Sequence, residues 1–350
     1  MNQRLIILTE GHTEPHAGKT AASVIRYRGD DVLALIDRTQ AGRHSGELLG
    51  VGTTPIVATL DEAGEADALL LGIAPPGGKI PESWQPTLHE ALRRGMDIIS
   101  GLHDFLNDDE ALKSLAQQHG CQLVDVRAQG KNFKTIARRK GLRESCFRVH
   151  TVGHDCSVGK MVASIELTNG LKQRGKDAHF IATGQTGIMV SGAGLPLDCI
   201  VSDFVAGAAE QLILESQDHE IVLVEGQGSL VHPSYSGVTL SLLHGCLPHA
   251  MIMCYEVGRD RVTGVEQVEI PPLTRIRELY ETMASIHQPC AVIGVAMNSR
   301  RITAEQAADE RKRQEDELGL PVCDVFRHGA DSLLDAIEAS QRKHLASLAT

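Results

Sequence analysis

The chain has 350 residues, and its 45 Asp and Glu against 34 Lys and Arg give a formal net charge of −11. An acidic chain is poorly suited to bind a nucleic-acid backbone, which needs clustered cations, and an aromatic content of 3% leaves few rings for stacking on bases. At this length one hydrophobic core gives way to two, so we expect two domains.

Short apolar runs alternate with amphipathic segments along the whole chain, which is the pattern of βα units on a parallel sheet. In the first part, strands are predicted at 5–9, 32–36, 68–72, 97–100 and 122–126. Helices are predicted at 86–94 and 108–119, the second of which opens with acidic residues that suit a helix N-terminus. Residues 1–145 are therefore predicted to form a Rossmann-like open sheet domain.

Between positions 127 and 148 the composition turns basic, with eight Lys or Arg side chains opposed only by Glu144. We place the domain boundary in this segment. Two interpretations stay open: the segment is a solvated linker, or its cations lean toward a polyanionic ligand of the neighbouring domain.

The alternation restarts beyond this segment. Strands are predicted at 147–152, 178–183, 221–225, 250–255, 291–296 and 322–326. Helices are predicted at 160–173, 204–214, 273–287, 304–318 and 332–341. Residues 146–350 are thus predicted to form a second domain with a doubly wound parallel sheet.

The eight cysteines are scattered, without a C-x-x-C pair or histidines at ligand spacing, which favours reduced thiols over a disulfide framework or a metal site. The N-terminus runs directly into a strand without a signal-peptide core, and no apolar stretch approaches the roughly 20 residues that cross a bilayer. We expect a cytoplasmic protein with no membrane partner and, from the general frequency of symmetric assemblies, a homo-oligomer.

The most informative segment, Gly153-His154-Asp155-Cys156-Ser157-Val158-Gly159-Lys160, lies between a predicted strand and a predicted helix. A phosphate-binding loop needs glycines that let backbone N–H groups turn inward, a helix N-terminus, and a lysine that reaches the outer phosphates. All three features are present. The residues expected to bind a diphosphate here are Gly153, Asp155, Cys156, Ser157, Val158, Gly159, Lys160 and Met161.

Met161 follows the lysine at the position where nucleotide-cleaving loops carry a Ser or Thr whose hydroxyl ligates magnesium. A thioether is a poor ligand for Mg²⁺. The loop therefore predicts a ligand whose pyrophosphate is held and not hydrolysed, and coenzyme A fits this description. Mg²⁺ is not expected to be essential.

The loop resembles the G-T-D-x-x-V-G-K-T loop of dethiobiotin synthetase and related P-loop proteins. Gly184-Gln185-Thr186-Gly187 is similar to the turn on their substrate side, and Val224-Glu225-Gly226-Gln227-Gly228 to their strand end V-E-G-A-G. Asn298 matches the asparagine with which these proteins read adenine. The resemblance implies a P-loop NTPase-like fold for the second domain.

Over both domains the chain more closely resembles the DUF1611 family, whose characterised activity is D-glutamate N-acetyltransferase. The resemblance is carried by segments such as Ser100-Gly-Leu-His-Asp-Phe-Leu, His154-Asp-Cys-Ser-Val-Gly-Lys-Met and Thr183-Gly-Gln-Thr-Gly, and it covers nearly the whole chain. It implies acetyl-coenzyme A as a co-substrate. His154 and Val162 stand where the family commonly has threonines, which could alter the phosphate cradle and removes one more hydroxyl from the magnesium side.

Acetyl transfer to an amine needs a base that removes a proton. Glu225 ends an apolar strand, where burial should raise its pKa toward that of a useful base; alternatively it holds Mg²⁺ through water or makes structural hydrogen bonds. Asp155 could orient the amine or cap the helix. His154 and His232 are alternative bases.

The acceptor is expected to lie on the glycine-rich turn at Gln185 and Thr186, with Ser191 nearby. Asp203 fits either a carboxylate near a metal or the acidic first turn of a helix. Arg259 and Arg261 could supply the guanidinium groups that a dicarboxylate needs, or be solvated.

Asn298 closes a predicted strand, and its amide can both donate to and accept from the edge of an adenine. Arg300 and Arg301 follow directly. They could meet the 3′-phosphate that distinguishes coenzyme A from ADP, or lie on the surface.

The leading hypothesis is an N-acetyltransferase that uses acetyl-coenzyme A and a small acidic amino acid, which the family resemblance identifies as D-glutamate. The alternative enzyme is an ATP- and Mg²⁺-dependent ligase or kinase similar to dethiobiotin synthetase. A third hypothesis is a non-catalytic nucleotide or coenzyme sensor. Both enzyme hypotheses imply small-molecule partners.

Overall fold

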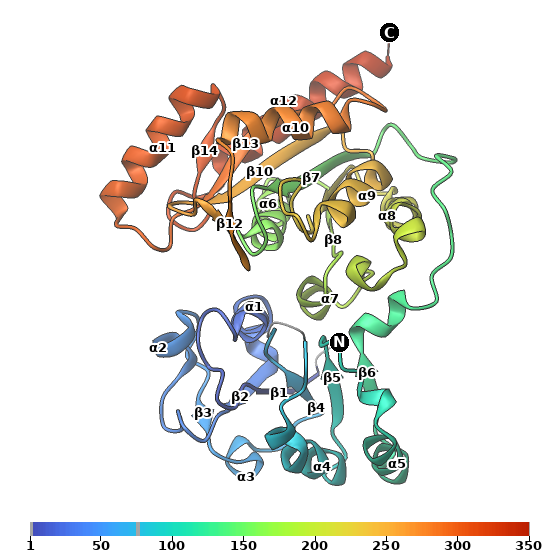
Figure 1. The fold of residues 1–350 in the computed structure, drawn as a ribbon, viewed down its shortest axis with the longest axis vertical. Helices are drawn as coiled ribbons and strands as arrows, with labels where there is room; N and C mark the ends of the chain where they lie inside the picture. Colours follow the sequence, from blue (N-terminus) through green and yellow to red (C-terminus); the bar gives the residue numbers. More distant parts are fainter. Residues whose placement is uncertain (1–2, 75–77, 350) are drawn as a thin grey trace. The chain divides into compact units, whose positions relative to one another are not determined.

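The computed structural model describes residues 3–74 and 78–349 (Figure 1). The chain divides into two compact units. One consists of Met1–Lys131 together with Ile188–Gly192, and the other of Asn132–Gly187 together with Ala193–Thr350. No helix among the described residues is both long and apolar enough to cross a membrane.

The first unit is built on a six-stranded sheet whose strands are all parallel, in the order β3-β2-β1-β4-β5-β6. The strands are β1 (Leu5–Leu8), β2 (Val32–Ile36), β3 (Ile56–Val57), β4 (Ala68–Leu71), β5 (Asp97–Ser100) and β6 (Leu123–Asp125). Every residue of β1 and β4 is buried, which explains their uninterrupted apolar sequences. The predicted open parallel sheet is confirmed.

The helices of the first unit include the two that the sequence predicted. They are α1 (Lys19–Arg28), α2 (Ser45–Leu49), α3 (Leu60–Ala63), α4 (Gln85–Arg93) and α5 (Glu110–His119). The start of α5 is fixed by Asp109, whose side chain accepts from the N–H groups of Ala111 and Leu112. Its end is fixed by Gly120 in the left-handed conformation.

The second unit also has a six-stranded, fully parallel sheet, in the order β14-β13-β10-β7-β9-β8. Its strands are β7 (Phe147–Gly153), β8 (Ala178–Ile181), β9 (Ile221–Val224), β10 (Ala250–Glu256), β13 (Ala291–Asn298) and β14 (Val322–Cys323). Because all six run in the same direction, their carboxyl ends share one edge of the sheet. Open α/β sheets bind ligands at that edge.

Helices cover both faces of this second sheet. They are α6 (Lys160–Gln173), α8 (Ser202–Ser216), α9 (Ser236–Cys246), α10 (Leu273–Ala284), α11 (Ala304–Leu318) and α12 (Asp331–Leu348). Helix α7 (Gln185–Ser191) begins in this unit, and its residues from Ile188 onward belong to the first unit. On β10, Ala250 and Ile252 pack in the core with α6 and α12, whereas Met251 and Met253 pack with α10 and α11. The doubly wound architecture is confirmed.

Several elements differ from the sequence-based expectations. Helix α9 and the antiparallel hairpin of β11 (Arg261–Val262) and β12 (Val265–Glu269) were not predicted, and the turn expected at 184–187 begins helix α7. The predicted strand 322–326 ends at Cys323, because the Asp324 carboxylate accepts from the N–H groups of Phe326 and Arg327 and turns the chain.

The basic segment begins in a 3-10 helix (Val126–Gly130), and its residues 132–146, which precede β7, form neither helix nor strand. The Glu210 carboxylate accepts from the backbone N–H groups of Arg138 (2.8 Å) and Arg139 (2.6 Å). At Gly207 a Cβ would lie 1.9 Å from the Thr135 carbonyl oxygen, so only glycine allows this approach. The segment is therefore held to α8 through its backbone, and the Arg138 and Lys140 side chains are exposed.

Candidate active site

The glycine-rich loop lies between the end of β7 and the start of α6, at the carboxyl edge of the second sheet. Ser157 (φ 55°) and Gly159 (φ 108°) have left-handed backbone conformations, of the kind that turns successive N–H groups toward one anion. At Gly153 a Cβ would lie 3.0 Å from Val158 Cγ2 and 3.1 Å from the Cys254 carbonyl oxygen. The loop therefore has the tight backbone that phosphate binding requires.

Lys160 is the first residue of α6 and is buried within the loop. Its Nζ donates to the Asp155 carbonyl oxygen at 2.7 Å. Burial lowers the pKa of this ammonium group. A phosphate oxygen in the loop would offer the lysine an anionic acceptor in place of that carbonyl, and the helix N-terminus adds to the attraction.

Asp155 fastens the loop to the hairpin β11–β12. One carboxylate oxygen accepts from the Cys156 N–H (2.7 Å), and the other accepts from the N–H (3.0 Å) and hydroxyl (2.7 Å) of Thr263 at the hairpin turn. Although burial alone would raise it, the hydrogen bonds from Thr263 hold the pKa of Asp155 below its ordinary value. Asp155 is therefore a carboxylate with its acceptor positions in use.

Arg259 makes a second fastening of the same loop. Its Nη1 donates to Asp155 (2.9 Å), to the Cys156 carbonyl (2.7 Å) and to the Thr263 hydroxyl (2.9 Å), while Nη2 donates to Glu256. The guanidinium group that the sequence suggested for a substrate carboxylate thus contacts the chain itself. Arg259 therefore connects the loop to Glu256 at the end of β10.

His154 and His232 lie in this network with their proton positions set by backbone groups. His154 Nε2 accepts from the Glu256 N–H (3.0 Å), and burial together with Arg259 lowers its pKa to about 3. His232 Nδ1 accepts from the Ser234 N–H (3.1 Å), so its proton is on Nε2, which donates to the Thr263 carbonyl (3.2 Å). In both rings the lone pair that a base would use is already engaged.

Glu225 is buried at the carboxyl end of β9. One carboxylate oxygen accepts from the N–H groups of Thr183 (2.9 Å) and Gly184 (3.1 Å). Burial nevertheless raises its pKa to about 7. The next residue, Gly226, leaves room for the phosphate loop, because a Cβ there would lie 1.8 Å from the Thr151 carbonyl oxygen and 2.8 Å from Lys160 Cδ. The structure thus brings a carboxyl that titrates near neutrality to the edge where the loop lies.

The expected acceptor turn adjoins this carboxyl. Gln185 and Thr186 are half-buried in the first turn of α7, immediately after the Gly184 N–H that binds Glu225. At Gly187 a Cβ would lie 2.4 Å from the Glu225 carboxylate, so a larger residue there would displace this group.

The other residues suggested for the acceptor lie elsewhere. Ser191 is exposed at the end of α7, and Asp203 is exposed in the first turn of α8. Arg261 lies in β11 and pairs with Glu269 across the hairpin at 2.9 Å.

Asn298 is the last residue of β13, beside the phosphate loop. Its Nδ2 lies 3.5 Å from the Val158 carbonyl oxygen, and its Oδ1 accepts from the Arg300 N–H at 3.3 Å. Arg300 and Arg301 in turn pair with Glu256, at 2.9 and 3.1 Å.

Three residues of this site were missed at the sequence level. Glu256 links three arginines, Thr263 binds Asp155, and the Tyr280 hydroxyl donates to the Gly153 carbonyl (2.9 Å) and accepts from the Leu230 N–H (3.2 Å). Only Glu256 carried a signal, as an acidic residue directly after an apolar strand.

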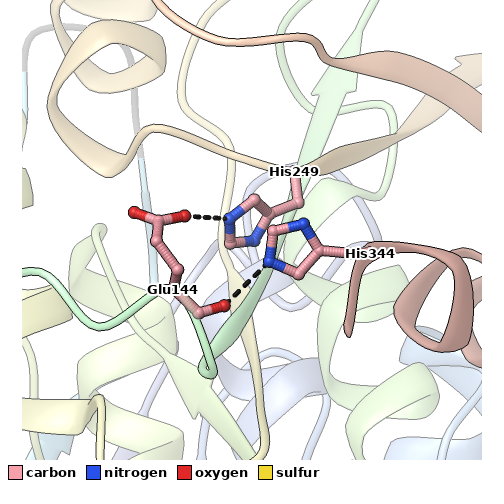
Figure 2. Close-up of side chains that lie close together, drawn as sticks. All are labelled: Glu144, His249 and His344. Carbon is pink, nitrogen blue, oxygen red and sulfur yellow. Dashed lines mark hydrogen bonds and ion pairs between the residues drawn. The ribbon is translucent and has the colours of Figure 1, made fainter. Parts of the chain in front are cut away.

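Two clusters of metal-ligand side chains occur in the described part of the chain. In the first, Glu144 contacts His249 (3.0 Å), and His344 donates to the Glu144 carbonyl (2.8 Å; Figure 2). The buried Arg148 guanidinium lies 2.9 Å from His249 Nε2. The backbone N–H of Arg148 donates a hydrogen bond to His249 Nδ1. A cation this close opposes metal binding. The contacts instead form a network of hydrogen bonds and one Arg148–Glu144 ion pair that joins the start of β7 to α12.

The second cluster comprises Asp155, Cys156 and His232 of the phosphate loop region. Arg259 already occupies the Asp155 carboxylate, and His232 Nε2 carries a proton. These groups fit a metal ion poorly.

Comparisons with known proteins cover both units. A family model described as a P-loop domain of unknown function, DUF1611_C, matches residues 128–334, and one described as a Rossmann-like domain, DUF1611_N, matches residues 38–129. The crystal structure of a DUF1611 family protein from Anabaena variabilis ATCC 29413 superposes with a TM-score of 0.91 at 38% identity, covering 96% of this chain and 99% of that one.

Two curated relatives have the name D-glutamate N-acetyltransferase. The protein from Tritonibacter scottomollicae is 36% identical over 324 residues, which is 92% of this chain and 95% of the relative. The protein from Pseudoalteromonas sp. is 38% identical over 270 residues, covering 77% of this chain and 80% of the relative.

Proposed function

The chain belongs to the DUF1611 family, and on that premise we propose that it is an N-acetyltransferase that transfers the acetyl group of acetyl-coenzyme A to the amine of D-glutamate. The relatives' names support the reaction and the acceptor. The donor is proposed from the chemistry of the phosphate loop.

The observation that carries the proposal is the Glu225 carboxyl. It is buried at the carboxyl edge of the second sheet, where the phosphate loop also lies, and burial raises its pKa to about 7. A general base works best when its pKa lies near the operating pH. An amino group is protonated at neutral pH, so it must lose a proton before it attacks a thioester. In the proposed reaction Glu225 takes that proton.

The phosphate loop fits a pyrophosphate that serves as a handle. Ser157 and Gly159 give the backbone its anion-binding shape, and Lys160 supplies a buried cation. Met161 offers no hydroxyl for magnesium. When bound, coenzyme A would supply the acetyl thioester. The residues of the loop would bind its pyrophosphate without hydrolysing it.

The acceptor would lie at the start of α7. Gln185 and Thr186 follow the N–H groups that bind Glu225, so an amine held there would be near the base. The amine nitrogen would form a bond to the thioester carbon as the carbon–sulfur bond breaks. The nitrogen would lose a second proton, which the departing thiolate takes up, giving free coenzyme A and an N-acetyl amino acid. The proton on Glu225 would then pass to solvent.

A ligase or kinase remains the second candidate, because a carboxylate at the end of a strand beside a phosphate loop also suits magnesium. The two functions differ in what they consume. A ligase or kinase needs Mg-ATP and releases ADP, whereas the proposed reaction needs neither metal nor nucleotide triphosphate.

The test is to mix the purified protein with acetyl-coenzyme A and D-glutamate in the presence of a metal chelator. The proposal predicts release of free thiol together with N-acetylglutamate, and little release with L-glutamate. Lack of thiol release across pH 6–9 would contradict it. Substrate-dependent ADP formation from Mg-ATP would establish the second candidate in its place.

A further inference from the structure

Glu256, at the end of β10, is a buried carboxylate on which three arginines converge. One oxygen accepts from Arg259, and the other lies 2.9 Å from Arg300 Nε and 3.1 Å from Arg301 Nε. The Glu256 side chain itself has no exposed surface. A single negative charge thus organises three positive ones beside the phosphate loop.

Two of the three guanidinium groups remain open to a ligand. Arg259 uses both η nitrogens on chain atoms, and its side chain is 11% exposed. Arg300 and Arg301 contact Glu256 through Nε, and their side chains are 45% and 61% exposed. Within the described residues, their η nitrogens donate no hydrogen bond. Each therefore presents the fork-shaped end that binds phosphate oxygens well.

The short segment that carries these arginines is held in place. Asp324 accepts from the Ser299 N–H (3.0 Å) and hydroxyl (2.5 Å), and Arg327 donates to the carbonyls of Ser299 (3.2 Å) and Ile302 (2.7 Å). Fixed donors lose less entropy when they bind a ligand than mobile ones do.

The ion pairs around Glu256 contain more cations than anions. Three guanidinium groups, those of Arg259, Arg300 and Arg301, face two carboxylates, those of Glu256 and Asp155, which leaves one positive charge. This charge suits a ligand with a further phosphate in addition to its pyrophosphate.

We propose that Arg300 and Arg301, oriented by Glu256, form a second phosphate subsite that binds a phosphate monoester on the ribose of the nucleotide held by the loop. This inference rests on the proposed function, in which that nucleotide is coenzyme A and the monoester is its 3′-phosphate. Asn298 links the two subsites, because its side chain contacts both the loop and the Arg300 backbone. The subsite makes the enzyme select coenzyme A over nucleotides that lack this phosphate.

The experiment compares acetyl-coenzyme A with acetyl-3′-dephospho-coenzyme A as donors to D-glutamate. For the unaltered protein we expect kcat/KM to be at least about tenfold higher with the 3′-phosphate, with similar kcat, because the missing charge-assisted hydrogen bonds are remote from the thioester. The double variant Arg300→Ala/Arg301→Ala should lose this preference. Its KM for acetyl-coenzyme A should rise to that for the dephospho donor.

Arg342→Ala is the matched control, since this arginine is similarly exposed (69%) and pairs with Glu338 on α12. It should keep the full preference. If the unaltered protein uses both donors equally well, or if the double variant keeps the preference, the subsite does not exist, although the proposed function stands. A rise in KM for D-glutamate alone in the double variant would assign the arginines to the acceptor instead. If neither donor supports acetylation and neither coenzyme binds in calorimetry, the proposed function itself fails.

Discussion

Replacing Glu225 by glutamine tests the role of the buried carboxyl through both catalysis and stability. Glutamine has nearly the same shape and keeps an oxygen that can accept from Thr183 and Gly184. It cannot take a proton from an amine. We expect kcat for acetyl transfer to fall by about 10²- to 10⁴-fold, the usual contribution of a general base.

The effect on stability follows from the raised pKa. Between pH 4.5, the ordinary pKa of a glutamate, and about pH 7, the raised pKa of Glu225, the folded protein keeps a proton that the unfolded chain has released. The stability of the unaltered protein therefore falls as the pH rises through this window. At about 1.4 kcal/mol for each pH unit, the difference in pKa lowers the free energy of unfolding, relative to low pH, by about 1 kcal/mol at pH 5 and by about 3 kcal/mol at pH 8.

The assay measures urea unfolding of both proteins at pH 5 and pH 8 by circular dichroism. The Glu225→Gln variant should be more stable than the unaltered protein at pH 8 by about 3 kcal/mol, with a much smaller difference at pH 5. Fluorescence of Trp84, the only tryptophan, reports on the first unit and should not differ between them. Glu210→Gln is the matched control for the activity assay, because Glu210 is also a 5% exposed glutamate and lies outside the proposed site.

Two results would refute this reasoning. If kcat of both Glu225→Gln and Glu210→Gln stays within about threefold of that of the unaltered protein, Glu225 is not the base. If the stability difference between Glu225→Gln and the unaltered protein does not grow from pH 5 to pH 8, the carboxyl is not held neutral by burial.

Three further predictions concern the phosphate loop and its surroundings. Lys160→Ala should weaken coenzyme A binding by on the order of 10- to 100-fold in calorimetry, because a charged donor is lost; unchanged affinity would place the pyrophosphate elsewhere. Arg259→Met should lower the free energy of unfolding by about 3 kcal/mol, since the buried Asp155 carboxylate loses its arginine and Glu256 loses one of its three. An effect as small as that of Arg342→Met would show that the Arg259 contacts contribute little to stability. Gly226→Ala should destabilise the second unit by at least about 2 kcal/mol, because its Cβ meets a backbone carbonyl. Gly237→Ala, which lies in α9 with open space at its Cβ, should keep or slightly raise stability in the same urea titration. Equal effects of the two substitutions would contradict the packing described.

The regular elements that the sequence predicted best have local signals that the fold reinforces. Helix α11 begins at a capping box of Thr303 and Gln306 and ends at the left-handed Gly319, and its predicted bounds are confirmed. Strands β7 and β10 are buried along their whole length, so their apolar runs were a sufficient signal.

Helix α9 shows why other elements escape prediction. Leu242 packs in one hydrophobic cluster and Leu243 in another, so the helix is apolar on more than one side and has no helical period. Gly245 weakens the helical signal further. It is needed because a Cβ there would lie 2.4 Å from the Ala206 carbonyl oxygen of α8, a packing constraint that only the tertiary structure shows.

The site divides in the same way. The phosphate loop could be predicted because its glycines, lysine and helix start lie in one short segment. The partners of Arg259 could not, because Asp155 lies 104 positions away along the chain and meets it only when the hairpin turn at Thr263 packs on the loop. An arginine that is open to a ligand and one that is hydrogen-bonded within the chain cannot be distinguished from the sequence. The difference depends on contacts between distant segments.

The central claim is that the loop from Gly153 to Lys160 holds the pyrophosphate of coenzyme A while reaction takes place at the other end of the molecule. A crystal structure of the protein grown with acetyl-coenzyme A tests it most directly. The account predicts pyrophosphate oxygens within hydrogen-bonding distance of the loop N–H groups and of Lys160 Nζ, with no metal ion between them. An empty loop, with the coenzyme bound at another place on the chain, would contradict it.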